Sequence, residues 1–349
     1  MTEMVAEVRG VDVVRVSAWL CEHVAGAVAP FEFSPIAGGR SNLTYTVTGA
    51  DGARFVLRRP PMGHVLATAH DMAREHRIIA AVGRTSVPVA PAMGLCDDLE
   101  VNGAPFYVMG YVDGVVLDSP TAGLGLERAS RTTASESLID VLVELHAVEP
   151  DVIDLGDLGR REGYLERQLR RWSTQWEKSK TRELPIVEEV HRRLSTGLPP
   201  QIHTGIVHGD YRLGNCLVDP SSGSLRAVLD WELCTLGDLL ADVGYLLVYW
   251  SDEGSASRRE NDPSGSPGFL SRAEMLDRYA RLSGRDLSSI GYYEAFSCWR
   301  LACIAEGVLN RYKAGVMGGE EQDFTSMEAG VGLLAERAMT ALEHSRSLG

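Results

Sequence analysis

Long hydrophobic runs are missing from this sequence. The most apolar stretch, residues 239–250, is short and contains Asp242. A membrane-spanning helix needs about 20 consecutive apolar residues, so a core helix is expected there and no membrane span. The first ten residues also lack the apolar segment of a secretory signal peptide. Both absences favour a cytoplasmic protein.

Positive charge and paired cysteines are also scarce. The chain has 34 Lys and Arg against 48 Asp and Glu, a formal net charge of −14. On average such a surface repels phosphates, which argues against a nucleic-acid partner. None of the six Cys forms a C-x-x-C pair, and several lie in apolar runs. We therefore expect buried free thiols in a reducing compartment.

The N-terminal third of the chain has mostly β-strand patterning. A helix is expected first, and a β-rich stretch follows it. Asp51-Gly52 is a hairpin signal that precedes a returning strand. One long helix and two further strands complete this part. The expected elements are a helix at 11–28, β structure at 34–48, a strand at 54–58, a helix at 67–82, and strands at 87–93 and 104–111.

Helical patterning dominates after Gly114, interrupted by short strands between Gly205 and Asp230. A β-rich part followed by a helical part predicts an α+β fold with two lobes, residues 1–110 and 111–349, and a hinge near 109–114. The Ser-, Gly- and charge-rich residues 251–268 are predicted to form a mobile loop. The expected helices span residues 126–147, 164–177, 186–195, 238–249, 272–282, 292–314 and 326–348.

Two acidic loops carry the most specific pattern. In the segment His208-Gly209-Asp210, the last residue lies five residues before Asn215. An apolar run precedes this segment, and a second apolar run precedes Asp230. The protein-kinase pattern H-R-D-x-x-x-x-N is met except that Gly209 replaces the Arg. Phosphoryl transfer needs a carboxylate to accept the proton of the attacking hydroxyl, together with oxygen ligands for Mg²⁺. The pattern predicts Asp210 as the base and Asn215 and Asp230 as metal ligands. His208 is expected to brace the loop through a backbone hydrogen bond.

Three acidic residues lie near Asp230 or just beyond it. Glu232 could lie near the metal, or it could be a solvated surface residue. Asp238 is predicted to be a helix N-cap, and Asp242 is expected to brace the Asp210 loop.

The strand at 54–58 fits the frame V-A-I-K with Arg58 in the Lys position. Period-two alternation places Val56 and Arg58 on one face, with Val56 covering the adenine and Arg58 reaching the phosphates. Arg59 points to the other face and is expected at the surface. Glu75, on the following helix, is the predicted partner of Arg58; the alternative is a solvated Glu on a helix face.

Two further segments are candidates for nucleotide contacts. Gly38, Gly39 and Ser41 could fold over the phosphates with their backbone N–H groups. This segment is not G-x-G-x-x-G, and a Gly pair before a hairpin is common. Met109 and Tyr111 are candidate adenine neighbours, with a plain core strand as the alternative.

Together these motifs resemble the aminoglycoside phosphotransferase/choline kinase family over about residues 36–247. The resemblance implies a two-lobed protein-kinase-like fold and transfer of the γ-phosphate of ATP, with Mg²⁺, to a hydroxyl of a small molecule. Residues 57–61, 69–75 and 237–242 look most like a subgroup of kinase domains fused to, or encoded beside, acyl-CoA dehydrogenases. That subgroup implies a hydroxyacyl-CoA acceptor and an association with enzymes of acyl-CoA metabolism.

Other functions stay open at this stage. An aminoglycoside or choline-type kinase would share the motifs, and a pseudokinase would bind nucleotide without turnover. Residues 160–183 carry eight basic and four acidic side chains in an acidic protein. Such a basic segment suits an anionic acceptor rather than a polycationic aminoglycoside. The alternative is a solvated helix of mixed charge.

Overall fold

The computed structural model describes residues 8–36, 42–62, 71–255, 262–315 and 323–347. The chain divides into two compact units. The first comprises Met1–Val115 together with Cys216–Asp219 and Leu225–Glu232, and the second comprises the rest. Within the described part of the chain, no helix is both long and apolar enough to cross a membrane.

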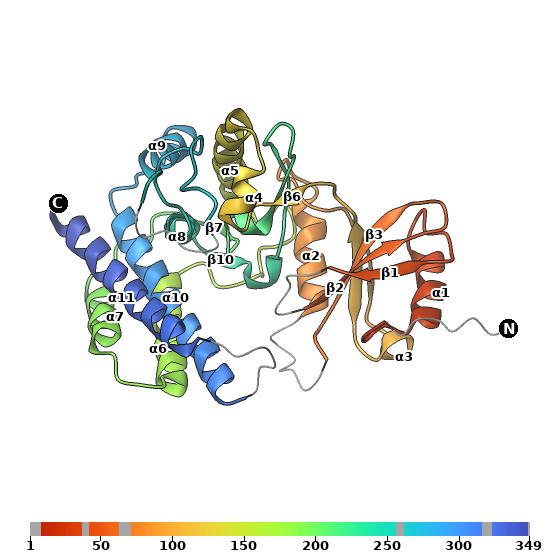
Figure 1. Ribbon diagram of the computed structural model, residues 1–349, viewed down its shortest axis with the longest axis horizontal. Helices are drawn as coiled ribbons and strands as arrows, with labels where there is room; N and C mark the ends of the chain where they lie inside the picture. Colours follow the sequence, from red (N-terminus) through yellow and green to blue (C-terminus); the bar gives the residue numbers. More distant parts are fainter. Residues whose placement is uncertain (1–7, 37–41, 63–70, 256–261, 316–322, 348–349) are drawn as a thin grey trace. The chain divides into compact units, whose positions relative to one another are not determined.

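The first unit is built on a five-stranded antiparallel sheet with the strand order β1-β2-β3-β5-β4. Helices α1 and α2 cover opposite faces of this sheet (Figure 1). A short hairpin of β8 and β9 also belongs to this unit. Its elements are α1 (Val13–His23), β1 (Glu32–Pro35), β2 (Leu43–Thr48), β3 (Arg54–Arg59), α2 (Met72–Val82), β4 (Ala92–Cys96), α3 (Leu99–Asn102), β5 (Phe106–Gly110), β8 (Cys216–Val218) and β9 (Leu225–Val228).

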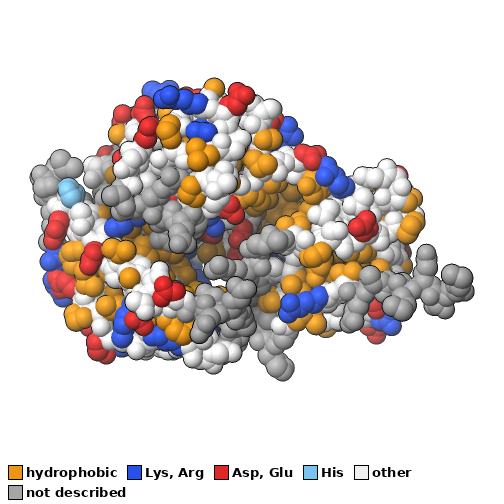
Figure 2. Space-filling view, viewed as in Figure 1, with side chains coloured by type: hydrophobic (Ala, Val, Ile, Leu, Met, Phe, Trp, Pro, Cys, Tyr) orange, Lys and Arg blue, Asp and Glu red, His pale blue; other side chains and the backbone are white. Residues whose placement is uncertain are grey.

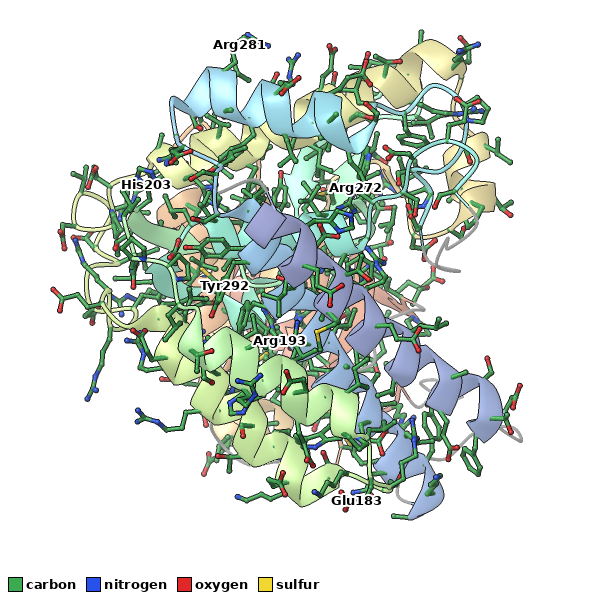
Figure 3. The ribbon with its side chains drawn as sticks, turned by 90° about the vertical axis from the view of Figure 1, so that its left-hand side faces the viewer. Glu183, Arg193, His203, Arg272, Arg281 and Tyr292 are labelled. Atoms are coloured by element: carbon green, nitrogen blue, oxygen red, sulfur yellow. The ribbon has the colours of Figure 1, made fainter. Side chains whose placement is uncertain are left out.

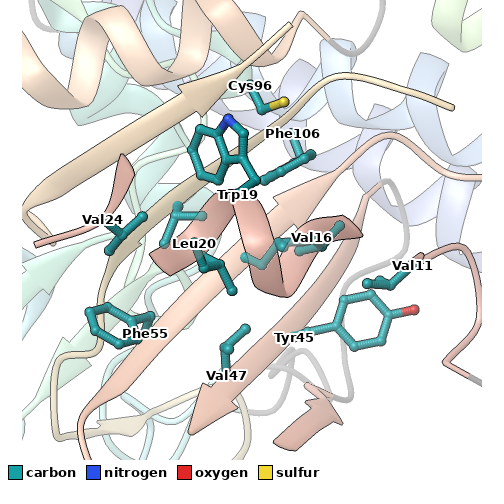
Figure 4. Close-up of a cluster of buried hydrophobic side chains, with 12 residues drawn as sticks. Val11, Val16, Trp19, Leu20, Val24, Tyr45, Val47, Phe55, Cys96 and Phe106 are labelled. Carbon is teal, nitrogen blue, oxygen red and sulfur yellow. The ribbon is translucent and has the colours of Figure 1, made fainter. Parts of the chain in front are cut away.

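The core of the first unit lies between α1 and the sheet (Figure 4). Leu20 of α1 is fully buried, and Trp19 meets the ring of Phe106 edge-on at 5.0 Å. Phe55 and Leu57 of β3 point into this core. Alternation along β3 therefore turns Val56 and Arg58 toward α2, as the sequence predicted.

Two expectations for this unit were wrong. Arg59 is 6% exposed, because Arg59 shares the α1 face of the sheet and donates hydrogen bonds to the Gly10 and Pro60 carbonyls. The strand expected at 87–93 begins only at Ala92, since Pro88 and Pro91 offer no N–H to a ladder. The helix expected at 67–82 is present as Met72–Val82, with Asp71 as its N-cap, and residues 67–70 lie outside the described residues.

The second unit is helical, with a two-stranded antiparallel ladder of β7 and β10. Helix α10 is central and contacts α6, α7, α8 and α11. The two-residue strand β6 (Val115–Val116) lies at the boundary. The elements are α4 (Pro120–Leu124), α5 (Arg128–Ala147), α6 (Tyr164–Ser179), α7 (Pro185–Thr196), β7 (Thr204–Val207), β10 (Thr235–Asp238), α8 (Leu240–Val248), α9 (Arg272–Ser283), α10 (Ile290–Lys313) and α11 (Phe324–Ser347). The expected division into a β-rich part and a helical part is confirmed.

Polar contacts join the helices around α10. Figure 3 labels Tyr292 on α10 beside Arg193 on α7, where the Tyr292 hydroxyl donates to the Leu194 carbonyl at 3.0 Å. Arg272 of α9 makes a 2.6 Å ion pair with Glu294 of α10. On the face shown in Figure 2, acidic and basic side chains of this unit are interspersed rather than gathered by sign.

Two local expectations for the second unit also need correction. Asp238 is not a helix N-cap: it ends β10, and its carboxylate accepts hydrogen bonds from Tyr293 Oη (2.6 Å) and Leu240 N (3.3 Å). Residues 256–261 of the expected mobile loop lie outside the described residues. In the following segment Asp262, Ser264 and Ser266 are buried. Five of the six Cys are buried free thiols, whereas Cys21 is exposed.

Candidate functional site

Arg58 is the centre of an acidic cluster in the first unit. From β3 it places its Nε 3.1 Å from Glu75 Oε1 on α2, and its Nη2 donates to Asp230 Oδ1 at 2.7 Å. Glu232 Oε2 lies 3.8 Å from the same Nη2 and accepts a hydrogen bond from Asn42 Nδ2. The Glu75 side chain is only 3% exposed. We call Arg58, Glu75, Asp230 and Glu232 the Arg58 cluster.

The Arg58 cluster has an excess of negative charge, with three carboxylates around one guanidinium. Burial favours the neutral form of Arg58, but the nearby carboxylates outweigh it and raise the pKa of Arg58. Burial, assisted by Asp230, also raises the pKa of Glu75 despite the opposing effect of Arg58.

The backbone at Asp230 has an unusual conformation. Its φ is 64°, in the left-handed region that non-glycine residues seldom adopt. The turn is fixed on both sides: Trp231, which is buried, donates its Nε1–H to the Val228 carbonyl at 3.1 Å. Val228 N in turn donates to the Pro88 carbonyl. Strain of this kind is held at functional sites where the surroundings over-determine it.

In the second unit, Asp242 fixes the loop that carries Asp210. Asp242 is fully buried on α8, and its two oxygens accept hydrogen bonds from His208 N (2.6 Å) and Gly209 N (2.8 Å). Burial alone would raise the pKa of Asp242, but His146, His208 and the Gly209 N–H outweigh it and lower that pKa. The expected bracing roles of Asp242 and His208 are both present, since His208 Nδ1 accepts from Asp210 N at 3.2 Å.

Gly209 is required by the geometry of the same loop. Its φ is 85°, and a Cβ added there would lie 2.9 Å from the Leu233 carbonyl oxygen. Its own carbonyl accepts a 2.7 Å hydrogen bond from Arg300 Nη2 on α10. Arg300 was not predicted from the sequence. It lies in a helix without a motif, 91 residues from Gly209.

Asp210 and Asn215 are in direct contact. Asn215 Nδ2 donates to Asp210 Oδ2 at 2.6 Å and to the Asp210 carbonyl at 2.8 Å. Among the described residues, no donor lies at hydrogen-bond distance from Asp210 Oδ1, which is 3.6 Å from Arg212 Nε. The loop therefore presents one carboxylate oxygen that Asn215 holds in place and one that can accept a proton.

The other predicted residues are placed as follows. Val56 pairs with Met109 across β3 and β5, so these two candidate adenine neighbours are adjacent. Tyr111 is half-buried, with the Arg54 guanidinium 4.0 Å from its ring centroid. Gly38, Gly39 and Ser41 lie outside the described residues.

No three His, Cys, Asp or Glu side chains converge as a ready-made metal site in the described ranges. Mg²⁺ does not need such a set, because one or two protein ligands usually suffice beside substrate phosphates and water. The carboxylate oxygens of Asp230 and the amide oxygen of Asn215 are of the hard kind that Mg²⁺ prefers.

Comparison with known proteins places the chain among related sequences. A family model described as "Phosphotransferase enzyme family" matches residues 32–279. The chain is 33% identical over 308 residues to mouse (Mus musculus) "Acyl-CoA dehydrogenase family member 10", covering 87% of this chain and 28% of that protein. It spans less than half the length of this relative and of a chicken (Gallus gallus) relative, "Acyl-CoA dehydrogenase family member 11", of which it covers 42%.

Solved structures show the same fold. A Ralstonia eutropha structure named "putative aminoglycoside phosphotransferase" is 31% identical, with a TM-score of 0.82 over 95% of this chain and 98% of that chain. The amicoumacin kinase hAmiN, in complex with AMP-PNP, Ca²⁺ and "Ami", has a TM-score of 0.59 at 14% identity over 95% and 93% of the two chains. The expected kinase-like α+β fold is thereby confirmed.

Proposed function

Because the chain belongs to the phosphotransferase enzyme family, we propose that it transfers the γ-phosphoryl group of ATP to a hydroxyl of a small molecule. The observation that carries this proposal is the Asp210 carboxylate, which is held by Asn215 through Oδ2 and, within the part of the chain that the structure describes, has no hydrogen bond at Oδ1. Oδ1 would accept the proton of the acceptor hydroxyl as its oxygen attacks phosphorus.

The Arg58 cluster supports nucleotide binding in the first unit. Arg58 would contact the phosphates, oriented by Glu75 at 3.1 Å. Val56, Met109 and Tyr111 would line the adenine site, and Gly38, Gly39 and Ser41 would contact the phosphates through their backbone N–H groups.

Asp230 and Asn215 are our proposed Mg²⁺ ligands. When bound, the ion would neutralise phosphate charge during transfer. Within this chain, the Arg58–Asp230 contact at 2.7 Å holds one ligand in place. The Asn215–Asp210 contact at 2.6 Å holds the other.

For the acceptor we propose a hydroxyacyl-CoA-like metabolite. The relative that covers 87% of this chain is named an acyl-CoA dehydrogenase family member, and it is several times longer than the matched region. A kinase joined to, or associated with, enzymes of acyl-CoA metabolism would meet acyl-CoA compounds. The buried free thiols fit a reducing compartment such as the cytoplasm.

An aminoglycoside kinase is the second candidate, because the Ralstonia eutropha structure carries that name at 31% identity. Its substrates are polycations and would require acidic side chains around the base. Besides the buried Asp242, which binds backbone N–H groups of the loop, the charged side chains placed at Asp210 are basic. Arg212 lies 3.6 Å from Asp210, and Arg300 binds the carbonyl of the preceding residue, Gly209.

A coupled ADP-release screen tests the proposal. Hydroxyacyl-CoAs, choline-like alcohols, sugars and aminoglycosides would each be offered with ATP and Mg²⁺. We expect turnover to be fastest with the hydroxyacyl-CoAs. Equal turnover across the classes would remove the support for that acceptor. No ADP release with any acceptor would leave a pseudokinase as the better account.

A further inference from the structure

Arg300 is a buried cation without an acidic partner in the described chain. It is 5% exposed on α10, and its Nη2 donates to the Gly209 carbonyl. Its Nε makes no hydrogen bond, and no carboxylate of the described residues forms an ion pair with it. A buried charge is costly unless it is paired. The structure therefore holds a guanidinium that lacks its counter-charge.

A second guanidinium, likewise without an ion pair among the described residues, lies near the same aromatic ring. Arg171 Cζ is 5.1 Å and Arg300 Cζ is 5.7 Å from the centroid of Trp172 on α6. Arg300 also lies 5.0 Å from the ring of Tyr245 on α8. Contacts with aromatic rings offset part of the burial of a cation but do not neutralise it. Arg171 is exposed, so the pair can be approached from solvent.

The pair lies beside the proposed base. Arg300 Nη2 binds the carbonyl of Gly209, the residue before Asp210. Tyr245, 4% exposed, interacts with both groups: burial and then the Asp210 carboxylate raise the pKa of Tyr245, and Arg300 opposes them. Tyr245 Oη also lies 3.4 Å from Tyr249 Oη. An acceptor with its hydroxyl at Asp210 would thus have Arg300 within reach of another of its groups.

Three of the seven other basic residues at 160–183 form ion pairs, and Arg160, Arg170 and Lys178 are exposed, where water and salt screen their charge. Arg161 pairs with Asp151 at 2.6 Å, Lys180 with Glu188 at 3.3 Å, and Arg182 with Glu306 at 3.3 Å. Arg167 donates to backbone carbonyls. The net charge of the segment is therefore not what favours an anion. What favours an anion is the pair Arg171 and Arg300, neither of which has an ion pair among the described residues.

We propose that Arg300 and Arg171 bind an oxyanion of the phosphoryl acceptor, a carboxylate or a phosphate group, so that the acceptor is an anionic hydroxy compound. This rests on the proposed function, in which Asp210 accepts the proton of the hydroxyl. An oxyanion would supply the counter-charge of the two guanidiniums and accept a hydrogen bond from the Nε–H of Arg300. A polycation would be repelled by both guanidiniums.

The test uses three probes that share one hydroxyl: 3-hydroxybutyrate, its CoA thioester and its neutral methyl ester. Binding to the full chain is measured by calorimetry with ADP and Mg²⁺ at low salt. We expect one or both anionic probes to bind about tenfold tighter than the ester, the value of one charge-assisted hydrogen bond. Tighter binding of the thioester alone would identify a CoA phosphate, and tight binding of 3-hydroxybutyrate would identify a carboxylate.

Variants of α6 provide the control. Arg171→Gln should weaken the binding of the anionic probe about tenfold and leave the binding of the methyl ester unchanged. Arg170→Gln removes the same charge from the next position of the helix, where the side chain is exposed, and should change neither. Arg300→Lys should raise the KM for the anionic acceptor more than it lowers kcat. A purely structural role for Arg300 would instead lower kcat for all three acceptors alike.

Equal binding of all three probes, or no binding of the anionic ones, would overturn the anion site. So would an Arg171→Gln variant with unchanged preference. These outcomes are separable from failure of the proposed function. Turnover without charge preference removes only the anion site, and charge-dependent binding without ADP release removes only the phosphotransfer.

Discussion

The Asp242→Asn substitution tests whether one buried carboxylate holds the Asp210 loop. Asp242 accepts the N–H groups of His208 and Gly209 at 2.6 and 2.8 Å. Asn keeps one acceptor oxygen and puts a donor in place of the other, so one loop N–H loses its partner. A buried hydrogen bond to a charged group is worth about 1.5–3 kcal/mol. We expect the second unit to lose about 2 kcal/mol of unfolding free energy.

Urea-induced unfolding measures the stability change, and ADP release with a verified acceptor measures the activity. A loop displaced by about 1 Å would lower kcat/KM on the order of 10²-fold. Asp286→Asn is the matched control: this exposed Asp accepts the Ser288 N–H at 2.8 Å, where water can replace it, so the change should stay within about 0.5 kcal/mol. If Asp242→Asn were as stable and active as the control, the bracing account would be refuted.

Three further predictions follow from individual contacts. Glu75→Gln should raise the KM for ATP about tenfold and leave the KM for the acceptor unchanged, because Arg58 loses its buried ionic partner. Steady-state kinetics with each substrate varied in turn measures both KM values. Gly209→Ala should lower the free energy of unfolding in urea more than Gly103→Ala does. At both positions φ is positive, which costs an alanine about 1–2 kcal/mol, but only at Gly209 would the added Cβ collide with backbone atoms. Burial depresses the pKa of His146, so the unfolded chain binds more protons and stability should fall as pH drops below about 6.5. Unfolding free energies that are flat across that range would contradict the last prediction.

Local sequence patterns predicted the parts of the site that depend on neighbouring residues. The spacing of Asp210 and Asn215 brings their side chains to 2.6 Å because both lie in one short loop. Alternation along β3 placed Arg58 toward α2, where Glu75 meets it. Glu232 joined the same cluster, since it follows Asp230 in the turn.

Tertiary packing decided what the sequence could not. Arg59 was expected at the surface, but the chain near Gly10 covers it. The side chain of Asp238 is bound by Tyr293 from a helix more than fifty residues away, which no capping pattern contains. Arg300 carries no motif, and only the packing of α10 against the Asp210 loop shows its place.

The most direct test of the central claim is the phosphorylation rate of Asp210→Asn with an acceptor verified in the ADP-release screen. Asn is isosteric with Asp but cannot take the hydroxyl proton. We expect kcat to fall about 10²–10⁴-fold while ATP binding is retained, the usual worth of a general base. A variant that phosphorylates the acceptor at the wild-type rate would contradict the assignment of Asp210 as the base.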